Sequence, residues 1–120
     1  MRWSACHLYT RANVRTYAPI NKGIYRLLIK NRIFYIGQGK NIQKRLLEHL
    51  GTREQNRCLK KYLKNYSCLF RFAELNSVED ILQTERDQIL KYKPPCNIAE
   101  HPPIVGRWRK PNIITPESVI

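Results

Sequence analysis

Residues 23–37 of this chain read GIYRLLIKNRIFYIG, and this stretch decides the fold. Two runs rich in β-branched and aromatic residues flank the polar tripeptide 30–32, and a glycine stands at the outer end of each run. Apolar runs on both sides of a short polar turn that contains asparagine are typical of a β-hairpin. Alternation along the first strand places Tyr25, Leu27 and Ile29 on one face. Because two strands alone are only marginally stable in water, later segments must cover them.

The composition indicates one basic globular domain. The chain has 120 residues, enough for a single core, and its 22 lysines and arginines against 9 aspartates and glutamates give a net charge of +13. An anionic partner relieves self-repulsion of this size, and nucleic acid is the commonest such partner. A membrane surface and a generally basic protein remain alternatives on charge alone. The sequence contains no run of about 18 apolar residues, so no membrane-spanning segment is expected.

The cysteine pattern favours reduced thiols. None of Cys6, Cys58, Cys68 and Cys96 stands in a C-x-x-C pair, and the first residues lack the apolar core of a secretory signal. We therefore expect reduced thiols and a cytoplasmic location. The spacing of the cysteines and histidines matches no zinc-site pattern.

The residues after the hairpin predict a helix. Asn41 is a candidate N-cap for a helix over 42–50, which Gly51 ends. In that helix Arg45 and His49 lie four residues apart, on one side of the apolar stripe. The stripe consists of Ile42, Leu46, Leu47 and Leu50.

A second helix is predicted over 55–65. Its apolar face consists of Leu59, Tyr62, Leu63 and Tyr66. By the ~100° step of an α-helix, four basic residues share another face, and they are Arg57, Lys60, Lys61 and Lys64. This basic face is either a phosphate-contact surface or a solvated surface, and the sequence leaves both open.

A third strand and a long helix follow. Residues 67–75 are rich in β-forming side chains and predict the strand. Ser77 and Asp80 form a capping box that opens a helix over 78–92. Its expected apolar stripe consists of Val78, Leu82, Glu85, Ile89 and Tyr92. A carboxylate in such a stripe has to be paired, protonated or bound to a cation, so Glu85 is either half of a structural pair with an arginine or a functional group.

These elements predict an α+β fold over residues 23–99, with a small three-stranded, mainly antiparallel sheet flanked by helices in the order β-β-α-α-β-α. The Pro94-Pro95 pair is expected to stop the last helix, and residues 96–98 to form a loop or a short extended piece. Residues 1–22 form an arm, either an added edge strand or a mobile segment. Residues 100–120 form a basic, proline-rich tail that either follows a nucleic-acid backbone or packs along the surface.

The triplets Gly23-Ile24-Tyr25 and Tyr35-Ile36-Gly37 resemble the pair that defines the GIY-YIG nuclease family. The residues that the family uses next follow in the same order, and they are Arg45, His49, Glu85 and Asn97. The resemblance covers residues 23–97. One departure concerns some homing-type members, which carry a further histidine near the start of the second helix, where this chain has Asn56-Arg57-Cys58.

The resemblance implies hydrolysis of DNA phosphodiester bonds with a single divalent metal ion. Glu85 would hold Mg²⁺ or Mn²⁺, hard cations that prefer oxygen ligands, and the metal would steady the leaving 3′ oxygen. Arg45, always protonated and fork-shaped, would clamp the phosphate oxygens as negative charge accumulates. A buried ion pair between Arg45 and Glu85 is the structural alternative.

The resemblance also implies roles for two tyrosines. Tyr25 would orient or deprotonate the attacking water, and Tyr35 would position the phosphate or that water. Because a phenol with a pKa of about 10 is a poor base at neutral pH, it needs a proton-accepting neighbour, and His49 is available. Asn97 would hydrogen-bond the site backbone or the substrate.

The remaining candidates concern backbone and binding. Gly23, Gly37 and Gly39 would permit tight turns and, for the last two, close approach of the backbone to phosphate. The residues expected to bind nucleic acid are Lys40, Lys44, Arg57, Lys60, Lys61, Lys64, Arg107, Arg109 and Lys110. The expected partner is DNA, with RNA left open, and a protein partner could supply specificity. The alternative functions are a catalytically idle nucleic-acid-binding module with the same fold and a scaffold whose tail binds a protein.

Overall fold

A four-stranded antiparallel sheet forms the centre of the molecule. The computed structural model describes residues 1–100, with side chains up to residue 97. The strand order is β1-β4-β2-β3. The strands are β1 (His7–Leu8), β2 (Gly23–Ile29), β3 (Arg32–Gly39) and β4 (Leu69–Glu74). The antiparallel α+β fold predicted from the sequence is confirmed, with one strand more than expected, because β1 pairs with the outer side of β4.

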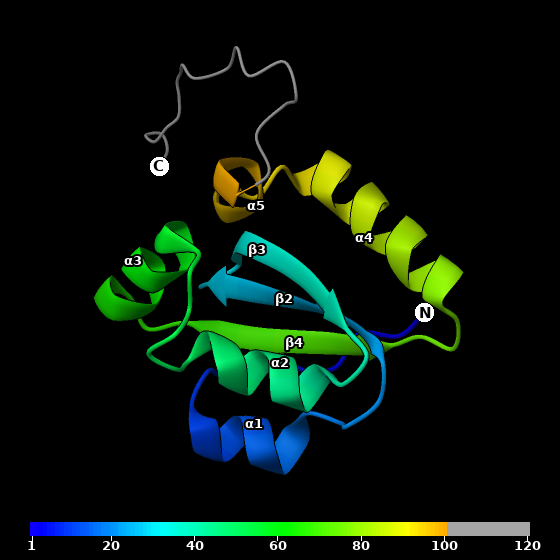
Figure 1. Cartoon of the computed structure of the whole chain (residues 1–120), viewed down its shortest axis with the longest axis horizontal. Helices are drawn as coiled ribbons and strands as arrows, with labels where there is room; N and C mark the ends of the chain where they lie inside the picture. Colours follow the sequence, from blue (N-terminus) through cyan, green and yellow to red (C-terminus); the bar gives the residue numbers. More distant parts are fainter. Residues whose placement is uncertain (101–120) are drawn as a thin grey trace.

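Five helices surround the sheet in the described part of the chain. They are α1 (Arg11–Tyr17), α2 (Ile42–His49), α3 (Arg57–Asn65), α4 (Val78–Tyr92) and α5 (Pro95–Glu100). Figure 1 shows α1 and α2 on one side of the sheet and α4 on the other. The main core lies on the α1–α2 side and includes Tyr25, Leu27 and Phe70. A smaller core of Ile24, Ala73 and Ile81 lies under α4, so the predicted alternation of β2 is confirmed.

The hairpin turn is tighter than expected. Only Lys30 and Asn31 lie between the strands, because Arg32 already pairs with Ile29. Lys30 has a φ of 56°, in the left-handed region that tight two-residue hairpin turns require.

A β-bulge interrupts β3, the second strand of the hairpin. Leu27 pairs with Tyr35 while Leu28 pairs with Ile33, so Phe34 is an extra residue in β3. An extra residue disturbs the alternation of side chains at that point. As a result, Phe34 and Tyr35 both belong to the main core although they are neighbours in the sequence.

Side-chain caps begin four of the described helices, and Thr10 caps α1 by accepting the N–H of Asn13. Asn41 and Ser77 each accept a hydrogen bond from the backbone N–H three residues ahead, which confirms both predicted starts. Asn56 does the same for α3, a cap that was not predicted.

The prediction for the segment after α4 was wrong. Pro94 and Pro95 were expected to lead into a loop, but α5 begins at Pro95. Lys93 ends α4 in a left-handed conformation with a φ of 45°, which turns the chain. Proline is well suited to the first turn of a new helix, because the N–H that it lacks has no helical partner there.

Residues 1–22 are ordered by contacts with the core. They supply the edge strand β1, which was one of the two expected alternatives, and the helix α1, which was not expected. Tyr9 and Val14 belong to the main core. The Tyr9 hydroxyl donates a 2.6 Å hydrogen bond to the carbonyl of Leu46, which ties this segment to α2.

Only part of the apolar stripe that was predicted for α4 is buried. Val78 and Leu82 are 55% and 47% exposed, whereas Ile81 is 2% exposed and packs against the sheet. The inner face of α4 continues from Ile81 with half-buried polar residues, among them Thr84 and Gln88, so the apolar period of the sequence does not predict this face. Two aromatic residues expected at buried faces, Tyr66 and Tyr92, are exposed.

The prediction of reduced thiols was also wrong for two of the four cysteines. Cys58 of α3 and Cys96 of α5 form a disulfide, with their Cα atoms 5.2 Å apart. The predicted loop after α4 is instead a helix that returns to α3, which brings the two residues together. Cys6 is exposed and Cys68 is buried, and neither belongs to a disulfide. No helix in residues 1–100 is long and apolar enough to cross a membrane.

Candidate active site

The phenol of Tyr25 is completely buried beneath α2. It lies on β2, and its hydroxyl is 2.6 Å from Nε2 of His49, the last residue of α2. The two triplets meet here, because Tyr25 pairs with Gly37 across the hairpin. A Cβ atom at Gly37 would lie 2.3 Å from the Tyr25 hydroxyl oxygen. The glycine of the second triplet therefore makes room for the tyrosine of the first, and the approach of phosphate expected there stays a prediction.

His49 is held from its other side by Glu54, in the loop between α2 and α3. The Nδ1 atom of His49 lies 2.6 Å from one carboxylate oxygen of Glu54. The second carboxylate oxygen accepts a 2.9 Å hydrogen bond from the backbone N–H of Asn56. Glu54 was not predicted as a site residue, since a glutamate in a loop belongs to no periodic pattern that would distinguish it.

The environment sets the protonation of these groups. Burial lowers the pKa of His49 despite the neighbouring carboxylate, so the imidazole is neutral at pH 7. Burial alone would raise the pKa of Glu54, but hydrogen bonds from the N–H of Asn56 and from His49 hold it below its ordinary value. Burial, followed by the nearby phenol of Tyr35, raises the pKa of Tyr25 well above 10.0, so this phenol is protonated before substrate binds.

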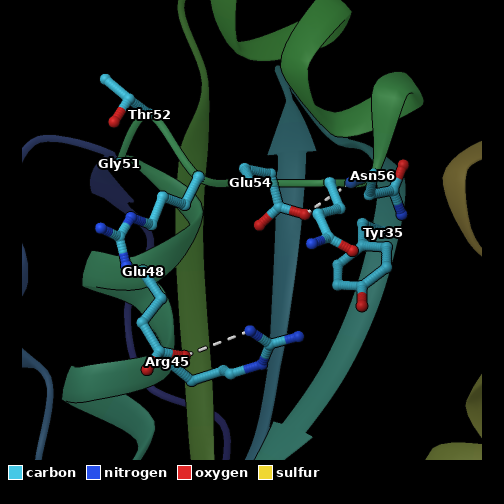
Figure 2. A pocket seen from close by; sticks show the side chains of 9 residues that line it. Tyr35, Arg45, Glu48, Gly51, Thr52, Glu54 and Asn56 are labelled. Atoms are coloured by element: carbon cyan, nitrogen blue, oxygen red, sulfur yellow. Dashed lines mark hydrogen bonds and ion pairs between the residues drawn. The ribbon is translucent and has the colours of Figure 1, made fainter.

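Tyr35 and Arg45 face a hollow of about 670 Å³. It lies in front of the buried, hydrogen-bonded side chains of Tyr25, His49 and Glu54. Figure 2 shows the hydroxyl of Tyr35 and the guanidinium of Arg45 pointing toward one another in this space. Arg45 is half-exposed, and its Nη1 lies 3.2 Å from a carboxylate oxygen of Glu48. Loop residues 51–56 complete the wall of the hollow. We refer to it below as the Tyr35–Arg45 hollow.

Glu85 lies outside this hollow, on α4. It is half-buried, and its negative charge contributes to the raised pKa of Tyr25, after burial and the other nearby groups. It lines a smaller depression with Leu82, Arg86, Ile89 and Leu90. Among the described residues, no three His, Cys, Asp or Glu side chains are grouped so that they could hold a metal ion by themselves.

Both the oxygen and the nitrogen of the Asn97 amide form hydrogen bonds with the backbone of the second triplet. Its Oδ1 accepts a 2.7 Å hydrogen bond from the N–H of Ile36, and its Nδ2 donates a 2.8 Å bond to the carbonyl of the same residue. β3 is an edge strand, so these groups face away from β2 and have no strand partner there. Of the two predicted partners for Asn97, the site backbone is the one that it contacts.

The expected basic residues lie at the surface where the structure describes them. The exposed ones are Lys40, Lys44, Arg57, Lys60, Lys61 and Lys64. Arg53, which the sequence analysis did not single out, lines the Tyr35–Arg45 hollow. The other three candidates, Arg107, Arg109 and Lys110, lie outside the described residues. Of the remaining glycines, Gly23 packs against the carbonyl of Ala73, where a Cβ would lie 2.2 Å away, and Gly39 lies beside Arg45.

Solved structures of one domain type share this fold. The GIY-YIG N-terminal endonuclease domain of UvrC from Thermotoga maritima, bound to its catalytic divalent cation magnesium, superposes with a TM-score of 0.62 at 22% identity. The match covers 72% of this chain and 93% of that domain. A cation-bound point mutant of the same domain matches with a TM-score of 0.60.

Curated relatives of this chain are named UvrABC system protein C. UvrABC system protein C of Aquifex aeolicus is 35% identical over 86 residues, which are 72% of this chain and 15% of that protein. The Rickettsia rickettsii protein of the same name is 29% identical over 82 residues, 68% of this chain and 12% of that protein. This chain therefore spans only a small part of the length of these relatives. No family model matches the chain.

The fold of this chain is thus that of the GIY-YIG domain, and the resemblance predicted from its two triplets is confirmed. Its similarity is to the UvrC form of that domain.

Proposed function

We propose that this protein is a metal-dependent endonuclease that hydrolyses phosphodiester bonds of DNA by a GIY-YIG type of mechanism. The observation that carries the proposal is the Tyr35–Arg45 hollow, in which a phenol and a guanidinium share a space wide enough for a phosphodiester. The similarity to UvrC, whose solved domain is an endonuclease, supports the same assignment.

Arg45 is the group that would bind the scissile phosphate. It is half-exposed in the hollow, and it carries a permanent positive charge in a planar fork of donors. Negative charge grows on the phosphate oxygens in the transition state, so a guanidinium already in place stabilises that state. Its contact with Glu48 aligns the side chain before the substrate arrives.

The two tyrosines divide the work according to their burial. Tyr35 is 8% exposed and lines the hollow, so it is the phenol that would position the phosphate and the attacking water. Tyr25 is 0% exposed and hydrogen-bonded to His49. We therefore assign Tyr25 and His49 to proton transfer behind the hollow, and not to direct contact with the substrate.

The residue proposed to hold the metal is Glu85. A divalent ion such as Mg²⁺ often takes one or two protein carboxylates and completes its shell with water and phosphate oxygens, so a single half-buried glutamate near Tyr25 fits this kind of site. When bound, the ion would stabilise charge on the phosphate and the leaving 3′ oxygen. We extend the same proposal to Mn²⁺, which prefers similar oxygen ligands.

The exposed basic residues would bind the DNA backbone. The α3 face and the start of α2 offer lysines and arginines whose attraction for phosphate depends little on sequence. RNA would be attracted in the same way, and a protein partner would then provide the choice of substrate. A cytoplasmic location remains a prediction from the sequence.

Cleavage of supercoiled plasmid and of a branched duplex tests the proposal. Each substrate is incubated with the protein in Mg²⁺, in Mn²⁺ and in excess chelator, beside Glu85→Ala and Arg45→Ala variants. We expect cleavage that requires metal and is lost in both variants. The exposed Arg15→Ala variant serves as the control for loss of one positive charge.

Two outcomes would contradict the proposal. Cleavage that survives Glu85→Ala and Arg45→Ala would show that the site is misassigned. Retardation of DNA by the wild-type protein without any cleavage would favour the idle binding module instead.

A further inference from the structure

Both carboxylate oxygens of Glu54 make contacts within the site, although the family resemblance gives this residue no role. Its side chain is 9% exposed, and His49 beside it is 1% exposed. One oxygen lies 2.6 Å from Nδ1 of His49, and the other accepts the N–H of Asn56. A carboxylate that is removed from water and bonded through both oxygens has one orientation.

The contacts fix which nitrogen of His49 carries the proton. An ionised carboxylate only accepts hydrogen bonds, so Nδ1 must be the donor toward Glu54. In a neutral imidazole the other nitrogen is then an acceptor, and Nε2 lies 2.6 Å from the hydroxyl of Tyr25. Each of the two short contacts thus has one proton, with Tyr25 donating to His49 and His49 donating to Glu54.

The loop that carries Glu54 is itself anchored. Asn56 caps α3 by accepting the N–H of Leu59, and its side-chain amide contacts the carbonyl of Cys96 at 3.5 Å. At the other end, the N–H of Gly51 bonds to the carbonyl of Glu48 and closes α2. Glu54 therefore stands between two fixed points, which suits a residue that has to hold another in place.

We propose that Glu54 is a positioning residue of the nuclease site, one that keeps His49 protonated at Nδ1 so that Nε2 can take the proton of Tyr25. This inference rests on the proposed function. In the transfer, the O–H bond of Tyr25 breaks and an Nε2–H bond forms, which leaves a phenolate and an imidazolium. The negative carboxylate of Glu54 stabilises the imidazolium without itself taking the proton.

The test combines variants at Glu54 with two measurements. Glu54→Ala removes the acceptor, and Glu54→Gln keeps an oxygen acceptor but removes the charge. Glu79→Gln makes the same chemical change at an exposed glutamate of α4. The first measurement is the rate of metal-dependent DNA cleavage between about pH 5 and 9, and the second is the nitrogen NMR spectrum of the His49 ring, assigned with a His49→Gln variant.

We expect Glu54→Ala to cleave about 10- to 100-fold more slowly, the range found when a metal-bound histidine loses the partner that orients it. The Gln variant should lie between Ala and wild type, and Glu79→Gln should match wild type. The NMR spectrum should show His49 protonated at Nδ1 in the wild-type protein and a changed tautomer in Glu54→Ala.

The pH profile separates positioning from a purely structural role. The charged groups around His49 are Glu54, Arg45 and Glu48, and the phenols of Tyr25 and Tyr35 face its ring. Removing the charge of Glu54 takes away an influence that raises the pKa of His49, so the acidic limb of the profile should move to lower pH. A variant that only loosened the fold would not move that limb to lower pH, because exposing His49 to water raises its lowered pKa back toward 6.5.

Several results would overturn the inference. Cleavage by Glu54→Ala at the wild-type rate, or a wild-type His49 protonated at Nε2, would remove the role of Glu54 and leave the proposed nuclease intact. Absence of cleavage by the wild-type protein would overturn the nuclease itself, and the positioning role with it.

Discussion

The amide of Asn97 forms a pair of hydrogen bonds with the backbone of Ile36, 61 residues earlier in the chain. Ile36 is the middle residue of the second triplet and lies on the open edge of the sheet. The asparagine therefore takes the place of a neighbouring strand, and it holds the backbone of β3 at the residue after Tyr35.

Replacing Asn97 with alanine should destabilise the protein by about 2–4 kcal/mol. Two buried backbone groups of Ile36 would lose their partners, and each such loss costs roughly 1–3 kcal/mol. Urea unfolding followed by circular dichroism measures the change. Asn65→Ala removes an exposed amide that bonds only to the carbonyl of Lys61, and it should cost less. Equal effects of the two substitutions would contradict the bracing role of Asn97.

The disulfide between Cys58 and Cys96 should stabilise the fold by about 2–4 kcal/mol, because it closes a loop of 38 residues. Cys58→Ser should therefore unfold at lower urea concentration, whereas Cys6→Ser, at an exposed unbonded thiol, should not. Alkylation of the denatured, unreduced protein followed by mass spectrometry should label two thiols. Labelling of all four would show that the bond does not form.

Gly37→Ala should destabilise the protein by about 1–3 kcal/mol, the usual cost of overpacking a core. The new methyl group would lie 2.3 Å from the hydroxyl oxygen of Tyr25, so the phenol would have to leave His49. Thermal unfolding measures the loss. At Gly51 the corresponding contact, with the carbonyl of Glu48, is 3.3 Å, and Gly51→Ala should be milder. The reverse order would mean that Tyr25 does not pack against Gly37.

Acidification should destabilise the protein below about pH 6.5. The folded pKa of His49 is lowered from 6.5 by burial, so the unfolded chain binds a proton there before the folded one does. Stability from neutral His49 is thus fully present above pH 6.5 and is lost as the pH falls toward the lowered value. Urea unfolding at several pH values measures the slope, and His49→Gln should reduce it. An unchanged slope in that variant would contradict the burial of a neutral imidazole.

Arg45→Ala should lower the rate of DNA cleavage about 100- to 1,000-fold, in line with the loss of one group that stabilises the transition state. Arg45→Lys should recover little, because an ammonium ion does not reproduce the planar fork. Rates under single-turnover conditions measure the effect, and Arg15→Ala is the control. Full activity in Arg45→Lys would reduce the role of this side chain to its charge.

Local features of the fold could be predicted from the sequence to a large extent. The hairpin, the caps at Asn41 and Ser77 and the basic face of α3 depend on neighbouring residues, and the structure confirms them. The orientation of α4 could not be predicted in the same way. Ile81, and not Val78 or Leu82, packs against Ile24 and Ala73, and this contact joins residues far apart in the sequence.

The sequence by itself determined the two triplets, their strands and the order of the candidate site residues, since alternation and helical spacing act over a few residues. Only the tertiary structure decided that Tyr25 is buried on His49, that Cys58 meets Cys96 and that Glu54 enters the site. These contacts join loops and helix ends that no local period relates. The residues in each contact come together only when the sheet has formed and the helices have packed against it. Patterns among neighbouring residues therefore cannot predict these contacts.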